Sequence, residues 1–162
     1  MKISPIKNAL LDSKMKTPLL RNSTKLKPSF YGLIIKLEPS ENKKYKATFD
    51  DNSVVYFGGK DYEDYTIHKD YNRKIRYMQR HQYYYTMTKD IKAPSILSLF
   101  ILWNFKSLKK SMDYYNKTVH KLYISGEPIP ANPELLAKVK KVDEYIKLCE
   151  ADNIKPYLVQ LL

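Results

Sequence analysis

The stretch FYGLIIKLEPSENKKYKATFDDNSVVYFGG, residues 30–59, decides the fold class of this chain. Three apolar segments rich in β-branched and aromatic residues alternate there with two turns built from Pro, Ser, Glu, Asn and Asp. In the middle segment Tyr45, Ala47 and Phe49 fall on one face, while lysine and threonine fall on the other. We therefore predict a small antiparallel β-meander over about residues 30–58.

Helical patterns dominate the remainder of the sequence. Ser107 is a suitable N-cap for one helix, and Asn132 followed by Pro133 is a typical start of another. The segment ILSLFILW, residues 96–103, is apolar nearly all round, which is typical of a buried helix. The sequence thus predicts an α+β fold in which the meander packs with several helices. Their expected ranges are about 68–82, 95–103, 107–123, 133–150 and 156–162.

Composition divides the chain into four segments. Residues 1–29 hold seven basic side chains, one acidic side chain and three prolines, which predicts an extended N-terminal arm. A core α+β domain is expected over residues 30–123, a proline-rich linker over 124–132 and a C-terminal helical segment over 133–162. The cations of the arm that we expect to bind a partner are Lys14, Lys16, Arg21, Lys25 and Lys27.

The chain carries a formal net charge of +12, from 29 basic and 17 acidic side chains. This excess favours polyanions or acidic protein surfaces as partners, the alternative being a composition that is simply rich in Lys, Asn, Ile and Tyr. Cys149 is the single cysteine, so no disulfide can form within one chain and a reducing compartment is expected. No secretory signal opens the sequence, and its longest apolar run, Leu99–Trp103, is far shorter than the ~20 residues of a spanning helix. We therefore expect no membrane insertion.

The segment DYEDYTIHKDYNRKIRYMQRH, residues 61–81, separates into two faces on a helical wheel. With Asp70 or Asn72 as N-cap, the helix runs to about Gln82. One face is apolar and is expected to pack on the sheet; the other presents a row of cations without an interspersed glutamate. Two interpretations of this row stand: a binding face for a polyanion or an acidic partner, and a plain solvated face. The apolar face comprises Ile67, Tyr71, Ile75 and Met78, and the cationic row comprises Lys69, Arg73, Arg76 and Arg80.

Three consecutive tyrosines, Tyr83, Tyr84 and Tyr85, follow this helix. Consecutive side chains cannot all face one core, and tyrosine suits a surface that is apolar at one end and polar at the other. We therefore expect interface aromatics among them.

No constellation in the sequence predicts catalysis. The histidines His68, His81 and His120 have no metal-ligand spacing to another His, Cys, Asp or Glu. Only four glycines are present, and none forms a phosphate-cradling loop. The acidic cluster DYED, residues 61–64, is better explained by helix capping or by pairing with nearby bases than by metal binding. We expect no catalytic residue, no metal site, no cofactor and no small-molecule substrate.

Residues 43–81 resemble the defining block of a family of small basic proteins of nucleocytoplasmic large DNA viruses. Members of that family have a Lys-Lys-Tyr strand, a Phe-Gly turn, a D-Y-T-x-H-K-D segment and an R-K-x-R-Y-x-x-R-H helix, and later a buried L-L-W-N segment before a Ser- and Lys-rich helix. The resemblance covers about residues 30–115 and departs from the family in the spacer over residues 83–94, which lacks the usual tryptophan and glycine. The matching segments here are Lys43–Tyr45, Phe57–Gly58, Asp64–Asp70, Arg73–His81, Ile101–Asn104 and Ser107–Asp113.

The resemblance implies a structural virion protein, made in the host cytoplasm and located in the capsid of a large DNA virus. Such a minor capsid, or cement, component binds beneath or between capsomers of the major capsid protein, and its expected partners are that protein and other minor capsid proteins. An extended arm and a basic helix suit this role, since both can gain contacts with neighbouring subunits. The alternative is a nucleic-acid-binding core or packaging protein that grips phosphates through the basic helix and the arm.

Overall fold

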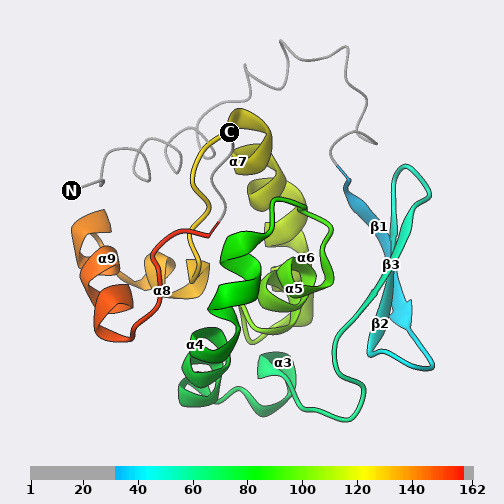
Figure 1. Ribbon diagram of the computed structural model, residues 1–162, viewed down its shortest axis with the longest axis horizontal. Helices are drawn as coiled ribbons and strands as arrows, with labels where there is room; N and C mark the ends of the chain where they lie inside the picture. Colours follow the sequence, from blue (N-terminus) through cyan, green and yellow to red (C-terminus); the bar gives the residue numbers. More distant parts are fainter. Residues whose placement is uncertain (1–31, 159–162) are drawn as a thin grey trace.

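A computed structural model describes residues 32–158 of the chain. A three-stranded antiparallel sheet in the order β1-β2-β3 forms one edge of the molecule, and the helices lie to one side of it (Figure 1). The strands are β1 (Ile34–Pro39), β2 (Tyr45–Phe49) and β3 (Val54–Phe57). The predicted α+β fold and its meander are therefore confirmed. The basic arm predicted over residues 1–29 lies outside the described residues.

The sheet buries one face and exposes the other, as the alternation predicts. Ala47, Phe49 and Phe57 are fully buried in the core, whereas Val54 and Tyr56 on the opposite face of β3 are exposed. Strand pairing follows a simple meander, with Ala47 opposite Val55 and Tyr45 opposite Phe57. The hydrophobic face of the sheet thus supplies one wall of the helical core.

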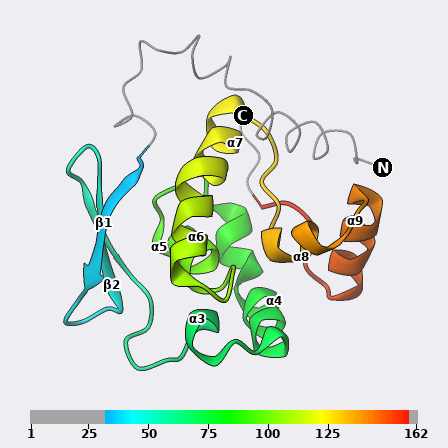
Figure 2. The same ribbon diagram turned by 180° about the vertical axis from the view of Figure 1, so that it is seen from behind.

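The predicted helix over residues 68–82 corresponds to α4 (Tyr71–Met87), which begins after the predicted cap Asp70. A separate short helix, α3 (Tyr65–His68), precedes it, and both are seen in the lower part of Figure 2. Lys69 ends α3 in the left-handed conformation, at φ +57°, and Asp70 then caps α4 through bonds to the backbone N–H groups of Asn72 and Arg73. Because Ile67 belongs to α3, its predicted place on the inner face of α4 is wrong, and its side chain is 54% exposed.

The next segments confirm the predicted apolar helix and the one that begins after Ser107. The apolar segment forms α5 (Pro94–Leu97) and the π-helical turn η2 (Ser98–Leu102), where the Trp103 N–H donates to the carbonyl of Ser98. The longer helix is a continuous run of α6, η3 and α7, capped at its start by Ser107 and ended by Gly126 at φ +78°. The bounds of this run are Leu108–Tyr114, Tyr115–Val119 and His120–Ser125.

The predicted helix over residues 133–150 is also divided, into α8 (Pro133–Lys138) and α9 (Val142–Ala151). Asn132 caps α8 as expected, but the backbone turns extended at Val139. The break lets each helix present its own face to the interior, where Glu134 of α8 and Tyr145 of α9 are both buried.

The prediction of a helix over residues 156–162 is wrong for residues 156–158, the part that the structure describes. Tyr157 pairs with Pro130 in an isolated antiparallel bridge, and the Leu158 N–H donates to the carbonyl of Ile129 at 2.7 Å. Pro128 to Asn132 are buried, and the core that contains Phe49 and Phe57 continues through Ile129 to Tyr145 and Cys149. Among the helices described between residues 32 and 158, none combines the length and the apolar character of a membrane-spanning segment.

Candidate functional site

A cleft of about 700 Å³ lies beside the cationic face of α4. Its walls come from four segments: the turn before β2, the loop after β3, α4 itself and the α5–η2 segment. Three members of the predicted cationic row, Arg73, Arg76 and Arg80, line this cleft. These three arginines therefore border a hollow in the surface, where Arg76 and Arg80 are exposed.

Positive charge exceeds negative charge in the cleft by three. Five cationic and two anionic side chains line it, counting His81 as neutral. Two of the cations are already paired: Lys44 Nζ lies 2.7 Å from Asp64 Oδ2, and Arg73 Nη1 lies 3.4 Å from Glu63 Oε1. The remaining cations, Lys43, Arg76 and Arg80, have no carboxylate within 4 Å among the described residues.

The loop after β3 is held by the ion pair between Lys44 and Asp64. Asp64 caps α3 through a bond from the Thr66 N–H, and Lys44 donates to both Asp64 and the carbonyl of Tyr62. The acidic residues of this segment thus cap a helix and pair with bases, as the sequence predicts for residues 61–64. No group of three or more His, Cys, Asp or Glu in the described part of the chain could hold a metal ion.

A stack of three aromatic rings forms the inner wall of the cleft. The Tyr77 ring lies parallel to that of Trp103, with centroids 4.1 Å apart, and the His81 ring stacks on the other face of Tyr77 at 4.1 Å. Burial raises the pKa of Tyr77 well above its ordinary value, so the phenol stays neutral. Because both faces of Tyr77 are occupied, neither face of this ring can stack on a ligand.

The other predicted site residues are placed differently. Lys69 does not line the cleft, since its Nζ folds back to donate to the carbonyl of Thr66 at 2.7 Å. Tyr83 and Tyr84 are exposed, at 68% and 61%, with their rings edge to face. Tyr85 is buried in the core, where its hydroxyl donates to the carbonyl of Met78, so it is not available to an interface. The five arm cations lie outside the described residues.

The histidines serve as packing and capping groups. His68 accepts a bond from the Asp70 N–H at Nδ1 and packs its ring 5.2 Å from that of Trp103. Its Nε2 is buried and has no hydrogen-bond partner among residues 32–158; this loss of solvation, with a contribution from Arg73, lowers the pKa of His68. His120 is buried edge-on against Tyr115.

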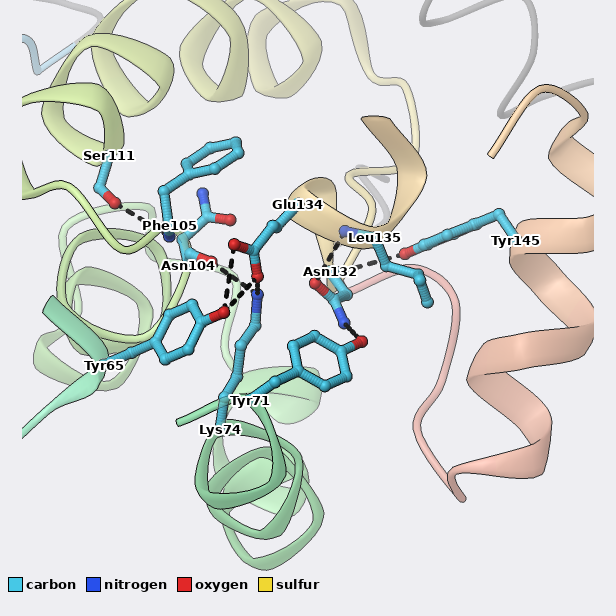
Figure 3. Close-up of polar contacts among 10 residues, drawn as sticks. All are labelled: Tyr65, Tyr71, Lys74, Asn104, Phe105, Ser111, Asn132, Glu134, Leu135 and Tyr145. Carbon is cyan, nitrogen blue, oxygen red and sulfur yellow. Dashed lines mark hydrogen bonds and ion pairs between the residues drawn. The ribbon is translucent and has the colours of Figure 1, made fainter. Parts of the chain in front are cut away.

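Sequence reasoning missed a buried ion pair that anchors α4 to the rest of the protein. Lys74 is fully buried, and Figure 3 shows its Nζ reaching Glu134 of α8, at 3.0 Å from Oε1, and the carbonyl of Asn104, at 2.6 Å. The hydroxyl of Tyr65 donates to the same carboxylate at 2.9 Å. Burial lowers the pKa of Lys74 to about 8, although the Glu134 carboxylate opposes the shift.

A second set of bonds continues the anchor toward α9. Asn132 donates from its side chain to the Tyr71 hydroxyl at 3.1 Å, and its backbone N–H donates to the Tyr145 hydroxyl at 3.1 Å (Figure 3). The Tyr145 hydroxyl in turn donates to the carbonyl of Pro156. These bonds fix one face of α4, which sets the direction of the opposite, cationic face.

One signal in the sequence could have revealed Lys74. It lies three residues after Tyr71 and four before Met78, so the helical wheel places it within the inward stripe. Its partner Glu134 follows 60 residues later, and no local pattern connects the two.

Residues 33–81 match the model of a family described as "Family of unknown function (DUF5754)". No curated protein and no solved structure matches the chain. The matched segment contains all five cationic residues of the cleft, from Lys43 to Arg80.

Proposed function

We propose that this chain is a structural virion protein, a minor capsid component of a large DNA virus that binds beneath or between capsomers of the major capsid protein. The resemblance of residues 43–81 to a block found in such viruses suggests the setting. The carrying observation is the surface of α4, where Arg76 and Arg80, which have no carboxylate within 4 Å among the described residues, continue into the exposed rings of Tyr83 and Tyr84.

Arginine and tyrosine together are typical of protein interfaces. Both are enriched among the side chains that contribute most of the binding free energy, and exposed arginine also steers an acidic partner during encounter. Tyr83 and Tyr84 lie on the last turns of α4, one turn beyond Arg80, so one partner can contact both kinds of side chain. This face is the contact that we assign to the capsomer.

The test uses virus particles in which the chain is replaced by a variant. Tyr83→Ser with Tyr84→Ser removes the exposed rings without touching the core and is expected to reduce the amount of the chain retained in empty, nuclease-treated shells. The matched control is Lys140→Ser with Lys147→Ser, two exposed positions distant from α4 in sequence. Loss of the unaltered chain together with the genome would contradict the capsid assignment.

Nucleic-acid binding is the second candidate. It is favoured by Lys43, Arg76 and Arg80, the three cations of the cleft that pair with no carboxylate of the described residues. Each phosphate contact contributes a slope of about 0.7 to 0.9 to the dependence of log affinity on log salt concentration. Replacing Lys43, Arg76 and Arg80 with Gln should therefore lower that slope by about 2 to 3 for a single-stranded oligonucleotide. An unchanged slope would place nucleic acid elsewhere on the chain or exclude it as a partner.

A further inference from the structure

We propose that the cleft beside α4 is a binding site for a small organic phosphate, with the phosphate group held by Arg76, Arg80 and Lys43. This inference goes beyond the capsid function; it shares Arg76 and Arg80 with the contact assigned to the capsomer, whereas the capsid assignment is tested through Tyr83 and Tyr84. It also departs from the sequence prediction, which provides for no small-molecule ligand, because the walls of the cleft come from segments far apart in the chain.

The two arginines lie about one helical turn apart, which lets them share one anion. Arg76 and Arg80 are four residues apart on α4, so their stems lie side by side, about 5–6 Å apart at Cβ. Lys43 reaches the same cleft from the turn before β2. None of the three is engaged by a carboxylate of the described residues, so their donors are free to bind a ligand.

The chemistry of the donors favours phosphate over carboxylate. A carboxylate has two oxygens and is satisfied by one bidentate guanidinium, whereas a terminal phosphate presents three oxygens and can accept from two. The cleft has a charge excess of three. A phosphomonoester carries a charge of about −1.5 to −2 at neutral pH, so a phosphomonoester or a diphosphate balances this excess better than a single carboxylate does.

The cleft also favours a small ligand over a nucleic-acid strand. A volume of about 700 Å³ lies within the range of small-molecule sites. The Trp103, Tyr77 and His81 rings are stacked on one another, so no base can stack on the faces of Tyr77. Hydroxyls of Ser95 and Tyr84 remain in the lining for the organic part of the ligand.

The experiment is a titration of the full chain with inorganic pyrophosphate and with ADP, followed by calorimetry and by Trp103 fluorescence. Trp103 is the single tryptophan of the chain and lines the cleft, so its emission reports binding there. We expect saturable binding of one ligand per chain, with an emission change that follows the heat. Arg76→Gln with Arg80→Gln should weaken binding at least about tenfold, since one bond to a charged group accounts for that much.

The matched control removes two charges elsewhere. Lys140→Gln with Lys147→Gln lowers the net charge equally at exposed positions outside the cleft and should leave affinity within about twofold. The proposal is overturned if the two double variants weaken binding equally, if neither probe binds, or if an oligothymidylate or a polyglutamate peptide binds more tightly than pyrophosphate. None of these results bears on retention in empty capsids, so the two proposals fail separately.

Discussion

At the scale of single residues, Gly58 shapes one wall of the cleft. Its φ of +89° is a conformation that L side chains rarely adopt, and its carbonyl accepts from the Lys44 N–H at 3.0 Å. A Cβ there would lie 2.8 Å from Lys44 Cβ and 2.9 Å from Leu102 Cδ1. The glycine thus allows the loop after β3 to approach both the turn and η2.

Gly58→Ala should therefore lower the free energy of unfolding by about 1–3 kcal/mol, measured by denaturant titration. Gly59→Ala is the control, because Gly59 has no positive φ and an added Cβ would meet only the ring of the exposed Tyr62. We expect that change to stay within about 0.5 kcal/mol. Equal losses from both substitutions would contradict the role assigned to the conformation of Gly58.

The buried ion pair makes a second prediction at this scale. Lys74→Met leaves the Glu134 carboxylate without its cation and the Asn104 carbonyl without its donor, which should cost about 3–5 kcal/mol of unfolding free energy at pH 7. Lys74→Met combined with Glu134→Leu removes both charges and should cost less than Lys74→Met alone. Thermal and denaturant unfolding of the two variants measure the difference; a double variant less stable than the single one would contradict this account.

The pKa of Lys74 predicts how the unfolding free energy depends on pH. The pKa is about 8 in the fold and near the ordinary 10.5 in the unfolded chain, so between these values the unfolded state binds more protons. Stability contributed by this side chain therefore rises with pH in that window, by up to about 1.4 kcal/mol per pH unit.

The comparison between the wild-type chain and the double variant Lys74→Met with Glu134→Leu isolates this effect, since both share the same buried tyrosines and neither holds a buried carboxylate without its cation. Their difference in unfolding free energy should be flat from pH 6 to about 7.5 and then grow in favour of the wild type between about pH 8 and 10.5. A difference that stays constant to pH 10 would show that Lys74 titrates normally in the fold.

At the scale of elements, the start of α4 depends on a single exposed cap. Asp70 Oδ1 accepts from the N–H groups of Asn72 and Arg73, and no acidic residue lies in the first turn to replace it. Asp70→Ala should reduce stability by about 0.5–2 kcal/mol, whereas Asp70→Asn should retain most of it, as seen in denaturant unfolding. If Asn is as harmful as Ala, the carboxylate has a role other than capping.

Local signals account for the elements that the sequence predicts correctly. The alternation around Ala47, the caps at Ser107 and Asn132 and the apolar run over residues 96–103 each specify structure within one segment. The break at Lys69 is marked by the cap at Asp70, whereas the break at Val139 has no comparable signal, because it is set by what the flanking helices bury. The pairing of Tyr157 with Pro130 has no local signal either, because the two residues are distant in sequence.

The candidate site shows the same division between local and distant information. The helical wheel places Arg73, Arg76 and Arg80 on one face correctly, since they belong to one helix. The opposite wall at Lys43 and the aromatic wall at Trp103 come from other elements, so the cleft itself cannot be read from periodicity.

At the scale of the whole molecule, the segment after Gly126 completes the core on which the cleft rests. Ile129, Tyr145 and Cys149 are buried with the sheet residues in one core, and Glu134 neutralises Lys74. A chain ending at residue 127 loses this apolar cover and leaves a buried cation unpaired. The 49 residues that match a known family model therefore need contacts from beyond their own segment.

We expect a fragment of residues 1–127 to show no cooperative thermal transition and to recover one when a peptide of residues 128–162 is added. Recovery follows because the peptide restores the Glu134 carboxylate and the Asn132 bonds to Tyr71, and covers the apolar surface against which Tyr145 packs. The same peptide with Glu134→Leu should restore the transition poorly, since it leaves the Lys74 charge uncompensated. Circular dichroism at increasing peptide concentration measures the recovery. A fragment that melts cooperatively without peptide would show that α4 and the cleft are held by the sheet and the first helices alone.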